Sequence, residues 1–336
     1  MRAAAVQFFA TPFALERNLQ TVERLAREAA ARGAQLIVLP ELFNTGYTYT
    51  PRLPSAAETI EGPTFTWLKR LSTELKVVLG GAMLLRDAAT VRDEFVLVEP
   101  DGKIHRYRKQ HPFIWERCYF RAGSEPIIAE TSVGRLGLLV CWDIAFRSAW
   151  EAYRGKVDAV LISSAPPRFH RAVLNFPKAR KMYVAELVPE LLRHREVIDD
   201  WYSGEVGRGA AFVGAPVVHS TMAGRFVTAL PFPRLSFGMT VATKPRYWSW
   251  AGEAGGATLR ATFYGSSAVF DVRGGALASV AEEEGLAVAE VGSAVTPPPD
   301  SPGLINGGFF LPRVPRQFQL MDSLLSLLTA YYRPQM

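Results

Sequence analysis

The chain has 336 residues, of which 49% are hydrophobic and 21% charged, and its formal net charge is +6. This composition excludes a disordered chain and is typical of a globular protein with a sizeable core. The basic residues are dispersed and accompany no known nucleic-acid-reading motif, so we expect no nucleic-acid partner. No apolar run approaches the roughly 18 residues of a membrane span, so we expect no membrane partner.

The two cysteines, Cys118 and Cys141, are too few for a disulfide framework or a zinc site. They favour a reducing compartment, and we predict a cytoplasmic protein. The N-terminus superficially resembles a short signal peptide, but Gln7 interrupts its apolar run and an amphipathic helix follows at once. We therefore interpret residues 2–9 as the first core strand.

Apolar strands and amphipathic helices alternate in the first half of the chain. After the strand at 2–9, Pro12 opens a helix that Gly33 ends. The next predicted elements are a strand at 34–40, a helix beginning at Gly62-Pro63, a strand at 76–84 and a hairpin over 94–109. This alternation predicts an α/β protein with helices on the outer faces of its sheets.

The second half is less regular. We predict strands at 126–130, 134–141, 157–164 and 212–220, helices at 147–154 and from Lys178 to about 197, and a final hairpin over 266–291. We find no internal repeat and no linker before residue 292. The prediction is one domain over 1–292, with an insertion at about 195–263, followed by an extended tail over 293–336. The tail ends in an amphipathic helix whose apolar residues are Phe318, Met321, Leu324, Leu325 and Leu328.

Three stretches place a reactive side chain just past the end of a strand. Glu41 follows "LIVLP", Lys109 follows "IHRYR" and Cys141 follows "LGLLV". Together these side chains would form a proton carrier, an oxyanion stabiliser and a nucleophile. Singly each has an ordinary alternative, since a buried cysteine is usually a small core hydrophobe. Glu41 could equally be a loop carboxylate or helix cap, and Lys109 a surface charge.

The combination and order of these segments resemble the nitrilase, or carbon–nitrogen hydrolase, superfamily. The matching stretches are "AAAVQF", "GAQLIVLPELFNTGY", "GKIHRYRKQHPF", "ERCYFRAG", "GRLGLLVCWD" and "YGSSAVFDVRGG". The resemblance implies an α-β-β-α sandwich in which Glu41 is the general base, Lys109 the oxyanion stabiliser and Cys141 the nucleophile. A second glutamate, usual a few residues after the lysine, falls on Glu116 and would orient Lys109. No metal or organic cofactor is implied.

We expect the substrate site to include Trp142, Tyr47, His111 and Ser164. The backbone N–H of Trp142, which follows the nucleophile, would complete the oxyanion hole. His111 also raises a papain-like Cys–His interpretation, but the surrounding sequence lacks the Cys-Gly-x-Cys context of that family. We expect Cys118 to be structural and Asp143 to bond the local backbone or shape the site.

The segment after the cysteine departs from the common amidase pattern. Ala145 stands where many relatives have arginine, and Arg147-Ser148 replaces Pro-Glu. The "CWD" motif followed by Phe146 is most similar to the carbamoyl-amine amidase branch, whereas the preceding "WER" is similar to true nitrilases. Thr221 occupies the place of the family's usual asparagine, which predicts different substrate contacts.

The region between Cys141 and Ser266 is long and rich in aromatic residues. We interpret these residues as a lid or pocket wall for an apolar or aromatic substrate: Trp201, Tyr202, Tyr247, Trp248 and Trp250. The alternative is that they pack the insertion against its own domain or against a partner subunit.

The leading hypothesis is hydrolysis of a small amide or N-carbamoyl compound through a cysteine thioester, releasing ammonia or an amine. The first alternative is a nitrilase that uses the same triad. The second is a non-catalytic scaffold, against which the presence of all four of Glu41, Lys109, Glu116 and Cys141 argues. The resemblance also implies a homodimer or larger homo-oligomer, formed through the outer helices.

Overall fold

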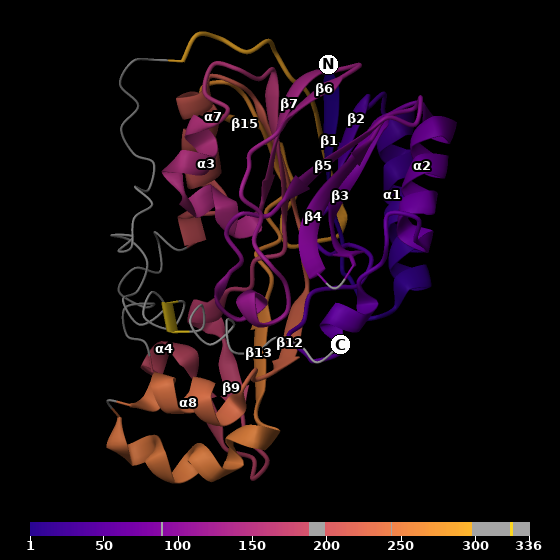
Figure 1. Ribbon diagram of the computed structural model, residues 1–336. Coiled ribbons are helices and arrows are strands. Elements are labelled where there is room, and N and C mark those ends of the chain that lie inside the picture. Colours follow the sequence, from indigo (N-terminus) through magenta and orange to yellow (C-terminus); the bar gives the residue numbers. More distant parts are fainter. Residues whose placement is uncertain (89, 188–198, 243, 298–322, 325–336) are drawn as a thin grey trace.

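Two six-stranded sheets pack face to face in the computed structural model, with helices on both outer faces (Figure 1). The structure describes residues 1–88, 90–187, 199–242, 244–297 and 323–324. Helices α1 (Leu15–Ala31) and α2 (Pro63–Leu75) cover one sheet, and α3 (Arg147–Glu151) and α7 (Gly204–Val213) cover the other. The predicted α-β-β-α sandwich is confirmed.

The first sheet has the strand order β16-β1-β2-β3-β4-β5. Its central strands β1, β2 and β3 are parallel, and the flanking pairs are antiparallel. The strand bounds are β1 Arg2–Gln7, β2 Leu36–Val38, β3 Val78–Asp87, β4 Thr90–Val98, β5 Ile104–Arg108 and β16 Gly285–Glu290. The predicted strands and helices of the first half are present, with β4 beginning four residues before the predicted hairpin.

The second sheet repeats this arrangement with the order β15-β14-β11-β8-β7-β6. Strands β7, β8 and β11 are parallel in its centre. The strand bounds are β6 Ile128–Thr131, β7 Gly134–Val140, β8 Ala159–Ser164, β11 Val217–Thr221, β14 Ala268–Phe270 and β15 Ala276–Ser279. Each sheet therefore directs the carboxyl ends of parallel strands to one edge, where functional groups tend to gather.

Both faces of the central strands are buried, which explains their continuous apolar sequences. In β1, Ala3 and Ala5 pack between the two sheets, whereas Ala4 and Val6 pack under the outer helices. This alternation follows from the two-residue period of a strand. Helix α1 contributes Val22, Leu25, Ala26 and Ala29 to the outer core layer.

A third, four-stranded antiparallel sheet extends beyond the lower end of the sandwich (Figure 1). Its order is β10-β9-β13-β12, with bounds β9 Val173–Asn175, β10 Lys181–Tyr183, β12 Arg225–Ala229 and β13 Thr258–Thr262. Helix α8 (Pro233–Val241) and the 3₁₀ segment η5 (Pro245–Gly256) lie between β12 and β13 in the chain. The sheet thus comes from two chain segments, and α7 and β11, which lie between them, belong to the sandwich.

The prediction that a helix begins at Lys178 is wrong. Residues 173–183 form the hairpin β9–β10, and a helix, α4, begins only at Val184 (Val184–Leu187). Leu174, Phe176 and Met182 are buried on the hairpin, and Ala179 has a positive φ of 57° in its turn. The remainder of the predicted helix, residues 188–198, lies outside the described residues.

The strand predicted over 212–220 is also partly wrong. Phe212 and Val213 end helix α7, and Gly214 takes a left-handed φ of 76° that stops the helix before β11. The predicted final hairpin is a β14–β15 hairpin only, because β16 crosses to the first sheet and pairs with β1. The predicted tail helix lies outside the described residues except at 323–324, which are helical.

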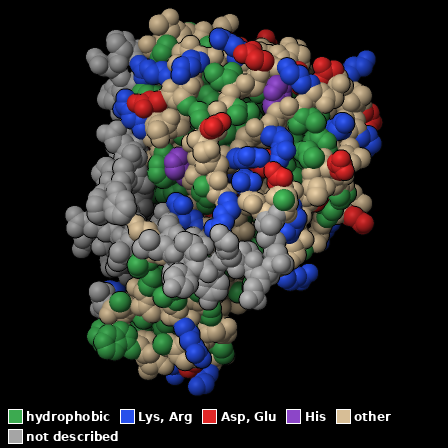
Figure 2. Space-filling view, in the orientation of Figure 1, with side chains coloured by type: hydrophobic (Ala, Val, Ile, Leu, Met, Phe, Trp, Pro, Cys, Tyr) green, Lys and Arg blue, Asp and Glu red, His purple; other side chains and the backbone are tan. Residues whose placement is uncertain are grey.

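Acidic and basic side chains intermix over the face of the molecule in Figure 2, in keeping with the dispersed charges of the sequence. None of the helices among the described residues combines the length and the hydropathy that a bilayer crossing requires.

Candidate active site

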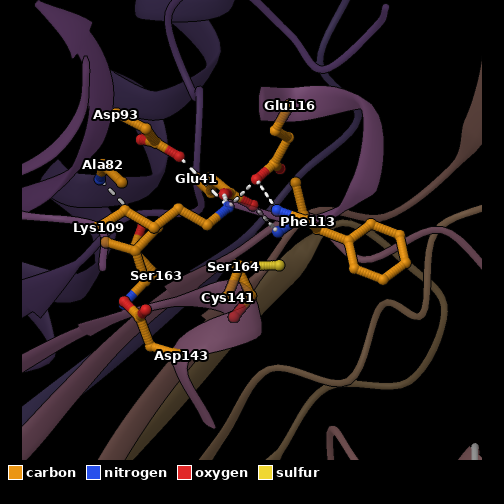
Figure 3. Close-up of polar contacts among 12 residues, drawn as sticks. Glu41, Ala82, Asp93, Lys109, Phe113, Glu116, Cys141, Asp143, Ser163 and Ser164 are labelled. Carbon is orange, nitrogen blue, oxygen red and sulfur yellow. Dashed lines mark hydrogen bonds and ion pairs between the residues drawn. The ribbon is translucent and has the colours of Figure 1, made fainter. Parts of the chain in front are cut away.

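Glu41, Lys109 and Cys141 converge where strands of the two sandwich sheets end (Figure 3). Glu41 follows β2 and Lys109 follows β5 of the first sheet, while Cys141 follows β7 of the second. All three residues are at most 4% exposed. The structure therefore brings together the three side chains that the sequence predicted at strand ends.

The ammonium group of Lys109 is surrounded by carboxylates. Its Nζ donates to Glu41 Oε1 at 2.6 Å and to Glu116 Oε2 at 2.6 Å. A third carboxyl oxygen, Asp93 Oδ2, lies 3.5 Å from the same nitrogen. Charge-assisted hydrogen bonds of this kind are the strong ones, and they fix Lys109 in one position.

Glu41 is held by the second sheet as well as by Lys109. Its Oε2 accepts the backbone N–H of Ala165 at 2.8 Å, just past the end of β8. Nearby, the Ser163 hydroxyl donates to Leu39 O at 2.8 Å and accepts Ala82 N–H at 2.9 Å. Ser163 therefore ties the two sheets together where the site is built.

Glu116 lies in the 3₁₀ turn η2 (Ile114–Cys118), and both of its oxygens are bonded. The Phe113 N–H donates to Oε2 at 2.6 Å, and the Tyr47 hydroxyl donates to Oε1. Tyr47 also shares a hydrogen bond of 2.8 Å with the Tyr49 hydroxyl. Glu116 is thus placed to orient Lys109, and that role stays a prediction from the family resemblance. Tyr47, expected in the substrate site, hydrogen-bonds Glu116, and its contact with substrate also stays a prediction.

Cys141 sits on a sharp turn between β7 and the 3₁₀ segment η3 (Cys141–Ala145), with a positive φ of 46°. Leu42, directly after Glu41, and Ile114, two residues before Glu116, have positive φ values of 51° and 40°. Such backbone costs on the order of 1–3 kcal/mol for each residue and clusters at functional sites. Of the eight non-glycine residues with positive φ among the described residues, three are therefore at or beside Glu41, Glu116 and Cys141.

Asp143 fixes the loops around the nucleophile. Its Oδ2 accepts Val140 N–H at 3.1 Å and the Tyr107 hydroxyl at 2.8 Å. Its Oδ1 accepts the N–H groups of Gln110 at 3.2 Å and His111 at 2.9 Å. The expectation that Asp143 bonds local backbone is confirmed, and these bonds join the Cys141 turn to the Lys109 segment.

Burial and charge set the protonation states of the cluster. Burial, reinforced by the charge of Glu41, raises the pKa of the Cys141 thiol well above its usual value. Burial alone would lower the pKa of Lys109, but the carboxylates of Glu116 and Glu41 outweigh it and raise that pKa. At rest the site therefore holds a neutral thiol beside a charged ammonium group.

Three of the expected substrate residues take structural partners. His111 Nδ1 lies 2.9 Å from Asp143 Oδ1, and its ring stacks on Phe146 with centroids 3.6 Å apart. Ser164 is buried, with its hydroxyl 3.1 Å from His219 Nε2. Trp142 packs against Phe113 and Trp201, with ring centroids 4.8 and 5.1 Å away. Whether these residues also contact substrate stays a prediction.

The aromatic residues of the middle region divide into two groups. Trp201 packs on Trp142, and the Tyr202 hydroxyl lies 3.6 Å from the Cys141 sulfur. In contrast, Tyr247 and Trp250 pack on each other with centroids 5.4 Å apart, and Trp248 is 57% exposed on η5. Among these five residues, Trp201 and Tyr202 adjoin the site, Tyr247 and Trp250 pack as the alternative predicts, and Trp248 is mostly exposed.

Sequence reasoning missed Asp93, a buried acid beside Lys109. Neither of its carboxyl oxygens accepts an N–H or O–H bond from the residues that the structure describes. Burial, together with the charge of Glu41, raises the pKa of Asp93 well above its usual value. A signal was present, because Asp93 alternates with the apolar Val91 and Phe95 and so lies on the buried face of β4.

Comparison with known proteins agrees with this architecture. Residues 2–297 match the model of the family described as carbon-nitrogen hydrolase. The chain belongs to the carbon-nitrogen hydrolase family. Among solved structures, the family member XC1258 from Xanthomonas campestris superposes with a TM-score of 0.60 at 20% identity, covering 86% of this chain and 89% of that one. The amidase from Nesterenkonia sp. AN1 gives a TM-score of 0.60 at 19% identity, covering 86% and 92%. These likenesses show the shared fold.

Curated relatives of this carbon-nitrogen hydrolase include proteins of two activities. A nitrilase from Pyrococcus abyssi is 33% identical over 135 residues, which cover 39% of this chain and 52% of the relative. The chloroplastic omega-amidase of Arabidopsis thaliana is 27% identical over 230 residues, which cover 63% and 58%. The matched part thus spans little more than half the length of either relative.

Proposed function

We propose that this carbon-nitrogen hydrolase cleaves the C–N bond of a small amide or N-carbamoyl compound through a thioester on Cys141. The observation that carries the proposal is the buried ammonium of Lys109, fixed at 2.6 Å from both Glu41 and Glu116 beside the thiol. A fixed cation next to a nucleophile, with a carboxylate to take its proton, is the arrangement that acyl transfer requires.

The first step needs both activation and charge stabilisation. Because the resting thiol is neutral, Glu41 takes its proton as the sulfur attacks the substrate carbonyl carbon. The carbonyl oxygen then becomes negatively charged. Lys109 and the backbone N–H of Trp142 donate to that oxygen, and each such donor is worth about 10²–10³ in rate.

The second half of the reaction releases both products. When the tetrahedral intermediate collapses, the C–N bond breaks and Glu41 returns its proton to the leaving nitrogen. Water then attacks the thioester carbon and gives a proton to Glu41. The C–S bond breaks, the sulfur recovers that proton, and the acid product leaves. A simple amide yields a carboxylic acid and ammonia, and an N-carbamoyl amine yields the amine, carbon dioxide and ammonia.

The named relatives support amide substrates and favour nitriles as the second candidate. One sequence relative is an omega-amidase and one structural neighbour is an amidase, and in a glutamate-to-glutamine mutant of that Nesterenkonia amidase acrylamide adds to the active-site cysteine. The likeness to the Pyrococcus nitrilase favours a nitrile substrate instead. In that case the sulfur attacks the nitrile carbon, giving a thioimidate whose nitrogen leaves as ammonia after water adds.

The test is ammonia release from a panel of amides, N-carbamoyl amines, N-carbamoyl amino acids and nitriles. Cys141→Ala serves as the blank, and Cys118→Ala as the matched cysteine control. Burial raises the pKa of Cys118 to about 12 with no carboxylate contributing, whereas Cys141 lies near Glu41, which can take its proton. We expect Cys141→Ala to lose at least about 10⁴-fold in kcat/KM while Cys118→Ala keeps its activity.

The substrate class with the highest kcat/KM identifies the branch. Turnover of amides or N-carbamoyl compounds above nitriles supports the proposal, and the reverse order replaces it with the nitrilase function. Ammonia release that persists undiminished in folded Cys141→Ala would contradict the thioester mechanism altogether.

A further inference from the structure

Tyr202 contacts the nucleophile directly, although it lies 61 residues further along the chain. Its hydroxyl oxygen is 3.6 Å from the Cys141 sulfur, within hydrogen-bond range for sulfur. Tyr202 comes from the turn before α7 and is 5% exposed. A buried phenol directed at a reactive sulfur is a chemical contact as well as a packing contact.

The surroundings hold Tyr202 in this position. Its ring lies against Tyr264, with centroids 5.2 Å apart, and stacks on His219 at 6.2 Å and 24°. The Ser266 hydroxyl donates to the Tyr202 carbonyl at 3.2 Å. The preceding residue, Trp201, packs on Trp142, the neighbour of the nucleophile. The hydroxyl therefore keeps its place beside the sulfur without a further ordering step.

An ion pair fixes the turn itself. Arg208 of α7 donates through Nη2 to Asp200 Oδ2 at 2.6 Å and through Nε to Glu205 Oε2 at 2.7 Å. The Ser203 N–H donates to Asp200 O at 3.1 Å. Since α7 packs on the outer face of the second sheet, Tyr202 is anchored to the same sheet that carries Cys141.

The chemistry of the two groups is complementary. Burial, with the charge on the Cys141 sulfur as the next cause, raises the pKa of Tyr202 well above its usual value, so the phenol keeps its proton and can donate. Burial likewise keeps the resting thiol neutral. When the thiol proton passes to Glu41, negative charge appears on a sulfur that bulk water does not reach. A donor already in place lowers the free energy of that charge.

We propose that Tyr202 is a further catalytic residue, whose hydroxyl donates a hydrogen bond to the Cys141 sulfur whenever that sulfur carries negative charge; the proposal rests on the function proposed above. The bond strengthens twice in each turnover. It does so first as the S–H bond breaks and the C–S bond forms. It does so again as the thioester C–S bond breaks and the electron pair returns to sulfur. The phenol keeps its proton throughout, so no additional reactant is needed.

The experiment measures alkylation of Cys141 by iodoacetamide as a function of pH, with kcat/KM for the best amide beside it. Tyr202→Phe removes the hydroxyl and keeps the ring. Mass spectrometry assigns the label to Cys141 or Cys118, and Cys141→Ala gives the blank. We expect Tyr202→Phe to slow alkylation near pH 7 and to lower kcat/KM, each by roughly 10- to 100-fold. We also expect it to raise the alkylation midpoint, which is the pH at which the alkylation rate reaches half its maximum.

The matched control is Tyr153→Phe. Tyr153 is fully buried behind β7, the strand that ends at Cys141, and its hydroxyl donates to Leu138 O at 2.8 Å. We expect this variant to keep the wild-type midpoint. The midpoint also separates charge stabilisation from access, because a wider opening would change the rate of alkylation but not the pH at which the thiolate forms.

The proposal would be overturned if Tyr202→Phe left the alkylation midpoint and kcat/KM unchanged. It would also be overturned if Tyr202→Phe moved the alkylation midpoint no further than Tyr153→Phe does. Should Tyr202→Phe fail to fold, Tyr202→Met fills the site with another apolar side chain and faces the same two outcomes. If the wild-type protein hydrolyses no compound of the panel, the proposed function fails. The alkylation contrast then still decides whether Tyr202 stabilises the thiolate.

Discussion

The sandwich and the third sheet serve the site in different ways. The sandwich supplies the ion cluster itself, because Glu41, Lys109 and Cys141 all follow its strands. The third sheet and α8, as far as the structure describes them, contribute no group to that cluster but hold the loops around it. Thr228 of β12 bonds Tyr49, and Ser236 of α8 accepts the Trp115 indole N–H at 3.0 Å. The sandwich thus carries the reactive side chains, and the third sheet and α8 hold the loops around them.

The support reaches the cluster through a short chain of hydrogen bonds. Thr228 holds the backbone of Tyr49, whose hydroxyl bonds that of Tyr47 at 2.8 Å. Tyr47 in turn donates to Glu116, which accepts from Lys109. Removing a member of the cluster should therefore have large effects on stability and activity, and weakening the support should have smaller ones.

The largest effect on stability is expected for Lys109→Met in the sandwich. The substitution leaves Glu41 and Glu116 buried without their cation, which typically costs about 3–5 kcal/mol in the free energy of unfolding. It also removes the predicted oxyanion donor, so kcat/KM should fall by at least about 10²–10³-fold. Denaturant unfolding and ammonia release measure the two effects.

Lys103→Met is the matched control for this change. Lys103 precedes β5 in the same hairpin, its side chain is 52% exposed, and it lies 3.8 Å from Glu99. Glu99 is buried but keeps its contacts with His105 Nε2 and the Ser132 N–H, so losing this long contact with an exposed ammonium group should change stability by no more than about 1 kcal/mol. A further variant, Lys109→Met with Glu116→Gln, should recover part of the lost stability because one unpaired carboxylate is gone. Equal stability of Lys109→Met and Lys103→Met would show that the cluster is not an ion pair.

A pH-dependent effect is expected for Asp93→Asn. Burial raises the pKa of Asp93, so the folded state binds a proton that the unfolded state releases above about pH 4. The wild-type protein therefore loses stability as the pH rises, by up to about 1.4 kcal/mol for each pH unit. Asparagine has no such proton. We expect the free energy of unfolding of Asp93→Asn, relative to wild type, to increase from about pH 4 to about pH 7.

Asp87→Asn provides the comparison for Asp93. Asp87 ends the neighbouring strand β3, and its side chain is 63% exposed. Its stability difference from wild type should stay nearly constant over the same pH range. A difference for Asp93→Asn that is equally flat would mean that Asp93 is ionised in the folded protein, and that Lys109 balances three negative charges.

Local patterns predicted the strands and the reactive residues that follow them, whereas the sandwich and the roles of those residues came from the resemblance to the family. Apolar strands such as residues 36–38 and 134–140 are recognisable in isolation, and the reactive residues follow them directly. Tyr202 and Thr228 depend instead on contacts across 61 and 179 residues of sequence. The strands of the third sheet have three to five residues of mixed polar and apolar type, so they show neither a continuous apolar run nor a clear period. The β9–β10 hairpin was therefore mistaken for a helix.

The smallest effect is expected in the third sheet, for Thr228→Val. The Thr228 hydroxyl accepts Tyr49 N–H at 2.8 Å and donates to Tyr49 O at 2.8 Å, and the residue is 3% exposed. Valine has the same shape but leaves both backbone groups of Tyr49 without partners, which should cost about 1–3 kcal/mol in the free energy of unfolding. Because Tyr49 supports Tyr47 and Glu116, kcat should also fall. The control is Trp248→Ala, at an exposed residue of the same region, which should change neither the free energy of unfolding nor kcat. A loss of stability with unchanged kcat would limit the third sheet to packing, whereas a loss of both would make it part of the support for Glu116.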